Sequence, residues 1–350
     1  EETYPLTFGV WIENIAISGL KNEELPAPND VYKQGAGISI RDVNFAYIRN
    51  VAVYRKEYGI RGTTTPGLPQ PIPSLITTIE NVLLAYNLYG VWLDGFVEET
   101  RINRLFGYMI QKGLIKLYTK YDAHINSVFS NACSYNSTNI RDATIYVSND
   151  GDLFISDVSI YDTHGNPSGT TGIFIDQGPR GKTYINKVLI QGINGDAIRT
   201  DGFGNVFISN AYIGTDQPEG VAGGPGNITG LAVMNYSTNI KIIIENSYIY
   251  CDQPECLHNV YLVRNSIGKQ IPPPNTEIVP QASPFSFKNT KPFLADVYIR
   301  GSATRVDIIN EDGKSNTINN TGNIKVTLMP NDTLSIYFSE PPTLVIKYIV

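Results

Sequence analysis

The sequence predicts an all-β protein, a right-handed parallel β-helix solenoid followed by a small antiparallel β-domain. Three observations lead to this prediction. A short phrase centred on Asn or Asp recurs between residues 12 and 249, a phrase that begins with Gly recurs between its copies, and a proline-rich stretch ends both patterns. The chain therefore divides into a parallel β-helix over 1–269, a Pro-rich linker over 270–284 and a C-terminal β-sandwich-like domain over 285–350.

The first phrase consists of an aliphatic residue, any residue, Asn or Asp, a small or aliphatic residue, any residue and a second aliphatic residue. Its copies lie at 12–17, 48–53, 79–84, 125–128, 155–160, 185–190, 208–213 and 244–249. Alternating aliphatic residues predict a strand with one buried face. At each bend an inward Asn can bond unpaired backbone groups and the Asn of the next coil, about 4.8 Å away. We therefore expect an asparagine ladder that places Asn81, Asn186 and Asn210 along one edge.

The second phrase is a Gly followed by alternating residues, as after Gly9, Gly37, Gly90, Gly172 and Gly230. Stacking these phrases in register would align their outward residues in two columns. The first column reads Trp11, Ser39, Trp92, Lys116, Tyr146, Phe174, Arg199 and Ala232. The second reads Glu13, Arg41, Asp94, Tyr118, Ser148, Asp176, Asp201 and Met234.

Aromatic rings beside carboxylates suit sugars, because C–H faces pack on rings while hydroxyls bond to acids. We therefore predict a ligand-binding stripe composed of Trp92, Asp94, Tyr146, Phe174, Asp176, Arg199 and Asp201. The alternative is that the outward aromatic residues only pack on one another or against a neighbouring subunit.

Asp176, Asp196 and Asp201 are the candidate catalytic residues. Asp176 and Asp201 fall on consecutive coils, and glycoside hydrolysis uses two carboxyl groups about 5–5.5 Å apart or about 6.5–9.5 Å apart. The alternative is that these carboxylates are only solvated surface groups.

Charge and spacing exclude several other classes. The formal net charge is −6, with 27 basic and 33 acidic residues, which disfavours nucleic acid as a partner. No apolar run approaches the roughly 20 residues that span a bilayer, so membrane insertion is not expected. No His-x-x-His, paired Cys-x-x-Cys or Gly-x-Ser-x-Gly motif occurs in the sequence, and we expect neither a metal nor a cofactor.

Other features favour an extracellular protein. Glycosylation sequons begin at Asn136, Asn227, Asn235, Asn319 and Asn331, and each would be a surface site in a secreted chain. Cys251 and Cys256 are close enough in sequence to close a disulfide loop.

The ladder and Gly phrases resemble the pectate-lyase-like superfamily, which includes polygalacturonases and viral tailspikes. The segment from Gly195 to Arg199, followed by 205–210, is similar to the polygalacturonase segment that carries a double aspartate. Only Asp196 is present here. The Gly-His-Gly and Arg-Ile-Lys motifs of polygalacturonases are missing, since His124, His164 and His258 have other neighbours.

The resemblance without the catalytic motifs favours a virion spike or surface adhesin, most like a tailspike, that binds host-surface carbohydrate. Such a protein would be an extracellular glycoprotein, on a virion or cell surface, and a homotrimer. The alternative is a secreted polysaccharide lyase or glycoside hydrolase that uses the stacked Asp residues.

Overall fold

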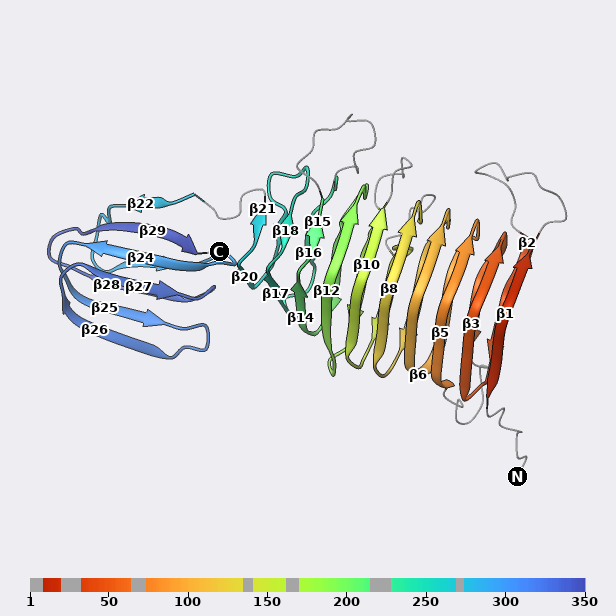
Figure 1. The fold of residues 1–350 in the computed structure, drawn as a ribbon. Coiled ribbons are helices and arrows are strands. Elements are labelled where there is room, and N and C mark those ends of the chain that lie inside the picture. Colours follow the sequence, from red (N-terminus) through yellow and green to blue (C-terminus); the bar gives the residue numbers. More distant parts are fainter. Residues whose placement is uncertain are drawn as a thin grey trace, which may run out of the picture.

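The computed structural model is all-β and describes residues 9–19, 33–63, 74–134, 141–161, 170–214, 228–268 and 274–349. Within these ranges every regular element is a strand (Figure 1). Strands up to residue 268 pair in parallel, and strands from residue 276 onward pair antiparallel. We call residues 10–268 the parallel part and residues 276–349 the antiparallel part.

The parallel part contains two ladders, in which each strand pairs with the equivalent strand of the next repeat. The first ladder consists of β1 (Val10–Ser18), β3 (Phe45–Tyr54), β5 (Ser74–Ala85), residues 97–108 of β6 (Tyr89–Tyr108), β8 (Ala123–Asn131), β10 (Leu153–Tyr161), β12 (Lys182–Gln191), β14 (Gly204–Ser209), β15 (Tyr212–Ile213), β17 (Ile240–Glu245), β18 (Tyr248–Ile249), β20 (Leu262–Arg264) and β21 (Ile267–Gly268). The second consists of β2 (Lys33–Arg41), β4 (Lys56–Thr63), residues 89–93 of β6, β7 (Gly113–Thr119), β9 (Ile145–Asn149), β11 (Ile173–Gln177), β13 (Ile198–Gly202), β16 (Val233–Asn235) and β19 (Leu257–His258).

The recurring Asn marks a fixed backbone conformation in the first ladder. One residue in each repeat has a φ between 46° and 56°, namely Asn14, Asn50, Asn81, Arg104, Ser127, Asp157, Lys187, Asn210, Asn246 and Asn265. Asn enters this left-handed region at a lower cost than most other residues. The backbone therefore explains why the phrase so often carries Asn.

The Asn side chains form part of the expected ladder, but they point outward. Asn50 Nδ2 donates to Asn14 Oδ1 at 2.9 Å, and Asn81 Nδ2 donates to Asn50 Oδ1 at 2.7 Å. All three residues are exposed, so the prediction of an inward Asn is wrong at these bends. A second pair, Asn210 and Asn186, is joined at 2.8 Å along the same edge.

Inward side chains of the first ladder form a continuous aliphatic row. Ile48, Ile79, Ile125, Ile185 and Ile244 are each fully buried, and each lies in register with the Ile of the neighbouring repeat. Full burial of one such side chain contributes about 1.5–3 kcal/mol. The repeated aliphatic positions therefore hold the stacked strands together.

Buried side-chain amides lie at the C-terminal ends of strands in the second ladder. Asn149 Nδ2 donates to the Gly151 carbonyl at 2.7 Å, and Gln177 Nε2 donates to the same carbonyl at 3.2 Å. Asn235 Nδ2 donates to the carbonyls of Ile240 and Asn259 at 3.1 and 3.0 Å. Because buried polar groups need such partners, these amides stabilise the turns that follow the strands.

The antiparallel part consists of two four-stranded sheets. The first contains β22 (Thr276–Ile278), β29 (Thr343–Ile349), β24 (Leu294–Arg300) and β27 (Ile324–Leu328), and the second contains β23 (Phe285–Lys288), β28 (Thr333–Tyr337), β25 (Ala303–Ile309) and β26 (Ser315–Thr321). Since β22 pairs with β29, this part begins within the range predicted as a linker, 270–284.

The antiparallel part packs on the C-terminal end of the parallel part (Figure 1). Phe293 is 4% exposed and belongs to the core of the parallel part, while Tyr348 contacts the cores of both parts. The Val263 amide donates to the Pro292 carbonyl at 2.5 Å. Because an open end of a repeat array exposes its core, this contact protects the last repeat from water.

Candidate functional site

The second ladder brings most of the first predicted column into register. Arg61, Trp92, Lys116, Tyr146, Phe174, Arg199, Met234 and His258 follow one another on neighbouring strands. We call this set the outer row. Trp11 does not belong to it, because β1 pairs with β3 in the first ladder. Ala232 is fully buried, and Met234 takes the position predicted for it.

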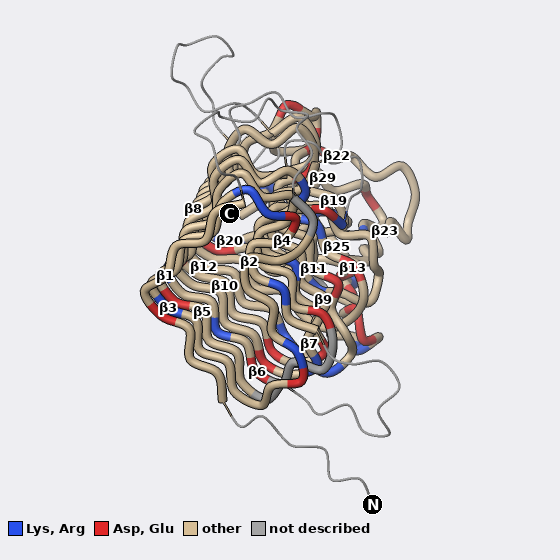
Figure 2. Tube along the Cα trace, turned by 90° about the vertical axis from the view of Figure 1, so that its right-hand side faces the viewer, with Lys and Arg blue, Asp and Glu red and all other residues tan. Residues whose placement is uncertain are grey.

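Acidic residues of the second column lie beside the outer row. Tyr118, Ser148, Asp176 and Asp201 are in register on neighbouring strands. Asp94 is exposed after the last paired residue of the first half of β6. Figure 2 shows basic and acidic residues close together on the side that carries β7, β9, β11 and β13.

Two predicted ligand-binding residues are covered. Tyr146 is 1% exposed and Phe174 is 4% exposed, so the prediction that a sugar stacks on these rings is wrong. They pack with Ala143 and Tyr118 in a small apolar cluster. Ala143 comes from the connection between β8 and β9, and sequence alternation does not reveal that this residue packs on the row.

Lys116 forms a buried ion pair at the centre of the row. Its Nζ lies 3.3 Å from Asp142 Oδ1, and the two side chains are 10% and 8% exposed. The same Nζ lies 4.3 Å from the centre of the Trp92 ring and 5.7 Å from the Tyr89 ring. The ammonium group is therefore held by a carboxylate and by aromatic faces, which attract cations. Trp92 is half-buried in this cluster.

Arg199 is enclosed in a similar way, but beside an open aromatic ring. Its guanidinium carbon lies 3.8 Å from the centre of the Tyr236 ring and 5.5 Å from that of Phe174. Its Nη1 lies 3.7 Å from Asp196 Oδ2. Tyr236 remains 49% exposed, so its ring is a supported and accessible platform.

The three candidate catalytic carboxylates have different surroundings. Asp196 Oδ1 accepts a hydrogen bond from the Leu231 amide at 2.9 Å, and its Oδ2 faces Arg199, so both of its oxygens have structural partners. Asp176 Oδ2 accepts from the Tyr146 hydroxyl at 3.4 Å. Asp201 is exposed, and its Oδ1 accepts from the Gly202 amide at 2.8 Å. Only Asp176 and Asp201 are in register, one strand apart.

The tyrosines of this region are neutral hydrogen-bonding groups at physiological pH. Burial, followed by the negative charge of Asp142, raises the pKa of Tyr89 above its ordinary value. Burial raises the pKa of Tyr146 too, with Asp176 as the next cause. Tyr118 has a raised pKa for the same main reason. These phenols stay protonated and can donate hydrogen bonds, and the nearby carboxylates can accept them.

Sequence reasoning missed the most exposed aromatic residues of this side. Tyr121, Phe203 and Tyr236 are 54%, 48% and 49% exposed. They lie in the turns beyond the ends of β7, β13 and β16, where the alternation of strand residues makes no prediction. Phe and Tyr in the turns after β7, β13 and β16 were the available signal, since turns are usually polar.

The other predicted surface residues have mixed outcomes. Asn235 is 1% exposed, and its amide is bonded to the backbone, so the prediction that this sequon is a surface site is wrong. Asn319 is exposed on β26, and Asn331 is half-buried. Asn136 and Asn227 lie outside the described residues. Cys251 and Cys256 are joined by a disulfide, with their Cα atoms 5.6 Å apart.

The described residues contain neither a cluster of metal ligands nor a membrane-spanning helix. Among the described residues, no three His, Cys, Asp or Glu side chains converge on a metal-sized space. The part of the chain that the structure describes contains no helix of the length and apolarity needed to cross a bilayer. Comparison with protein-family models gives no match, and a search of curated proteins gives no significant one.

Proposed function

We propose that this chain is an attachment protein, a virion spike or surface adhesin, that binds host-surface carbohydrate beside the exposed end of the outer row, where Tyr236 lies on Arg199. The observation that carries the proposal is the Tyr236 ring, supported on one side by Arg199 and accessible to solvent. Aromatic rings bind the C–H faces of sugars, and the carboxylates of Asp176 and Asp201 accept hydrogen bonds from hydroxyl groups.

We infer that the parallel part is a right-handed parallel β-helix of the pectate-lyase-like type, similar to a viral tailspike. Two parallel ladders in register, a left-handed residue once per repeat and an inward Ile row support this inference. The location would be extracellular, on a virion or cell surface. The disulfide between Cys251 and Cys256 supports such a location, because disulfides persist in oxidising compartments.

A second candidate function is a secreted glycoside hydrolase or polysaccharide lyase. The register of Asp176 with Asp201 favours it, because neighbouring strands are about 4.8 Å apart and bring the two carboxyl groups close together. Against it, Asp196 is already occupied by Arg199 and the Leu231 amide. Attachment therefore accounts for more of the observed contacts than digestion does.

Incubation with host-surface polysaccharide separates the two functions. We expect the purified chain to be retained on the polysaccharide without producing new reducing ends or unsaturated products. The Asp176→Asn and Asp201→Asn variants serve as controls. Steady release of products by the wild type, abolished in either variant, would replace attachment with the enzymatic function.

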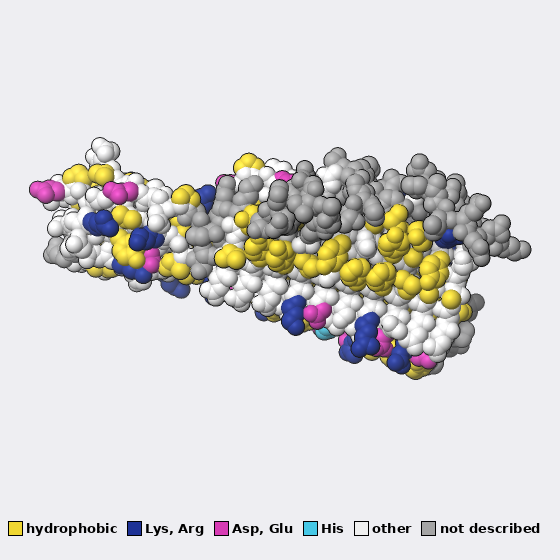
Figure 3. Space-filling view, turned by 45° about the horizontal axis from the view of Figure 1, so that its top comes forward, with side chains coloured by type: hydrophobic (Ala, Val, Ile, Leu, Met, Phe, Trp, Pro, Cys, Tyr) yellow, Lys and Arg dark blue, Asp and Glu magenta, His cyan; other side chains and the backbone are white. Residues whose placement is uncertain are grey.

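The proposed attachment protein is a homotrimer, and an apolar strip supports contact between copies. In the first ladder, ten neighbouring outward positions carry no charge: Ala16, Ala52, Leu83, Phe106, Phe129, Ser159, Leu189, Tyr212, Tyr248 and Ile267. Figure 3 shows a band of hydrophobic side chains along this side of the parallel part. At about 4.8 Å per strand and about 10 Å of width, the strip covers about 400 Å², the size of the largest apolar patch on a typical monomer, which is often functional. Identical copies offer strips of identical length, so parallel packing would cover them fully.

Replacing Phe106 and Tyr212 by Ser tests this contact. Both residues are partly exposed, at 39% and 37%, so the changes remove little from the core of one chain. We expect sedimentation to give three times the mass of one chain for the wild type and the mass of a single chain for the double variant. A wild-type monomer at tens of micromolar would contradict the trimer.

A further inference from the structure

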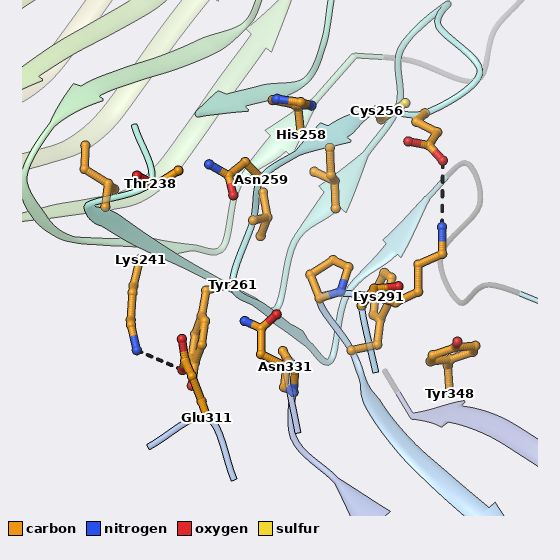
Figure 4. Close-up of a pocket in the computed structure, with 18 of the residues that line it drawn as sticks. Thr238, Lys241, Cys256, His258, Asn259, Tyr261, Lys291, Glu311, Asn331 and Tyr348 are labelled. Atoms are coloured by element: carbon orange, nitrogen blue, oxygen red, sulfur yellow. Dashed lines mark hydrogen bonds and ion pairs between the residues drawn. The ribbon is translucent and has the colours of Figure 1, made fainter. Parts of the chain in front are cut away.

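A cleft of about 530 Å³ lies where the parallel part meets the antiparallel part (Figure 4). The parallel part contributes Thr238, Lys241 and 255–261 to its walls, and the antiparallel part contributes 290–293, Glu311 and Asn331. Small-molecule sites occupy about 300–1,000 Å³ and occur preferentially between domains. The cleft therefore has the size and place of a ligand site.

Two ion pairs bridge the walls of the cleft. Lys241 Nζ lies 3.0 Å from Glu311 Oε2 on one side, and Lys291 Nζ lies 3.7 Å from Glu255 Oε1 on the other. Figure 4 shows both pairs as bridges between the two parts. Phe293, buried in the core of the parallel part, anchors the base. A preformed site of this kind loses little conformational entropy when it binds.

The chemistry of the lining indicates an uncharged ligand. Both lysines of the cleft already have a glutamate partner, and the charges of these four side chains sum to zero. An acidic ligand would have to displace those carboxylates. The remaining polar groups include Thr238, His258, Thr290 and Asn331, which offer hydrogen-bond donors and acceptors. The Tyr261 ring adds an aromatic surface. This combination of polar groups and an aromatic ring suits a ligand that carries hydroxyl groups.

The outer row leads to the cleft. Arg199, Met234 and His258 are in register on β13, β16 and β19, and His258 also lines the cleft. Two strand steps cover about 10 Å. The Arg199–Tyr236 platform and the cleft are therefore near enough for one short oligosaccharide to contact both.

Two cations of the outer row have the same pattern as those of the cleft. Lys116 faces Asp142 at 3.3 Å, and Arg199 faces Asp196 at 3.7 Å. The platform and the cleft are thus both charge-compensated, and neither selects an acidic sugar.

We infer that the cleft is a second subsite, which binds the end of a neutral oligosaccharide whose adjoining sugars lie on the Arg199–Tyr236 platform. This inference rests on the proposed carbohydrate function. It adds that the glycan is neutral and that its end is recognised between the two parts of the chain.

Calorimetry with neutral gluco-, xylo- and manno-oligosaccharides of increasing length tests the inference, with oligogalacturonate as the acidic comparison. Thr290→Trp should fill the cleft and weaken binding of the longer neutral ligands by tenfold or more, while short ligands that occupy only the platform keep their affinity. His258→Ala should weaken the longer ligands less. Asn316→Trp, an exposed position on β26, is the matched control and should not change the affinity for any ligand.

Raising the salt concentration tenfold should leave the Kd of the neutral ligand within about twofold, since no ion pair with the ligand forms.

The outcomes distinguish this inference from the function on which it rests. If Tyr236→Ala weakens binding and Thr290→Trp does not, the cleft inference is wrong and the proposed function stands. If oligogalacturonate binds more tightly than every neutral ligand, with strong salt dependence, the assignment to neutral glycans is wrong. If no oligosaccharide binds the wild type, the proposed function fails and the inference fails with it.

Discussion

Replacing Asp142 by Ala should lower the free energy of unfolding of the parallel part by about 3–5 kcal/mol. The change leaves the Lys116 ammonium buried without its carboxylate, 3.3 Å away in the native protein. Trp92 and Tyr89 offset only part of this loss, because an aromatic ring attracts a cation more weakly than a buried carboxylate does. The expected loss is a large share of the total stability of an ordinary domain.

Fluorescence offers a local measurement of this loss. The chain has two tryptophans, Trp11 and Trp92, and the Lys116 Nζ lies 4.3 Å from the Trp92 ring. In a Trp11→Phe background, Trp92 emission during denaturant unfolding therefore reports on this cluster. The double variant Lys116→Met/Asp142→Leu is the control, because replacing both charges by apolar groups removes the unpaired cation. It should recover most of the lost stability. An unchanged midpoint for Asp142→Ala would show that the pair is solvated.

The repeat could be predicted from the sequence because it is local and periodic. The aliphatic alternation around Ile48, Ile79 and Ile185 fixes which face is buried, and identical phrases one repeat apart align these residues in register. The same reasoning located the outer row from Trp92 to Arg199. Periodicity predicts which face of a strand is buried. In this chain it also predicted which residues of neighbouring strands are in register for most of the outer row.

Exposure could not be predicted in the same way, because it depends on contacts between segments distant in sequence. Asp142 lies 26 residues from Lys116, in a connection without any repeat, and the neighbouring Ala143 covers Tyr146 and Phe174. Asn235 reads as a surface sequon, yet the turn after β16 directs its side chain inward to backbone carbonyls. A sequon pattern carries no information about such a direction.

The orientation of the ladder Asn residues was missed for a backbone reason. An inward Asn and a left-handed Asn both recur once per repeat, so the sequence pattern is the same for the two. The φ of 56° at Asn14 and 53° at Asn81 shows that the left-handed backbone, and not an inward side chain, selects Asn at these positions. Once the backbone turns in this way, the side chain is exposed and bonds to its equivalent in the next repeat.

Replacing Tyr236 by Ala should weaken carbohydrate binding by about tenfold or more, which corresponds to a loss of about 1.4 kcal/mol or more. The ring is supported by Arg199 at 3.8 Å and is 49% exposed, so it is ordered before a ligand arrives. Removing it takes away the sugar-stacking surface and frees the Arg199 side chain. Tyr236→Phe keeps the ring and should retain most of the affinity, because stacking does not require the hydroxyl.

Trp11→Ala provides a matched control for the loss of an exposed aromatic residue. Trp11 is 73% exposed, but it lies in the first ladder, away from the outer row. Its removal should leave binding unchanged. Thermal unfolding of each variant confirms that the fold is intact before affinities are compared.

The Kd of host-surface carbohydrate for the wild type, Tyr236→Ala, Tyr236→Phe and Trp11→Ala is the most direct test of the carbohydrate-binding face. Stacking of a sugar on the Tyr236 ring predicts measurable binding by the wild type, near-normal binding by Tyr236→Phe and Trp11→Ala, and at least tenfold weaker binding by Tyr236→Ala. Equal affinities for all four folded proteins would contradict it.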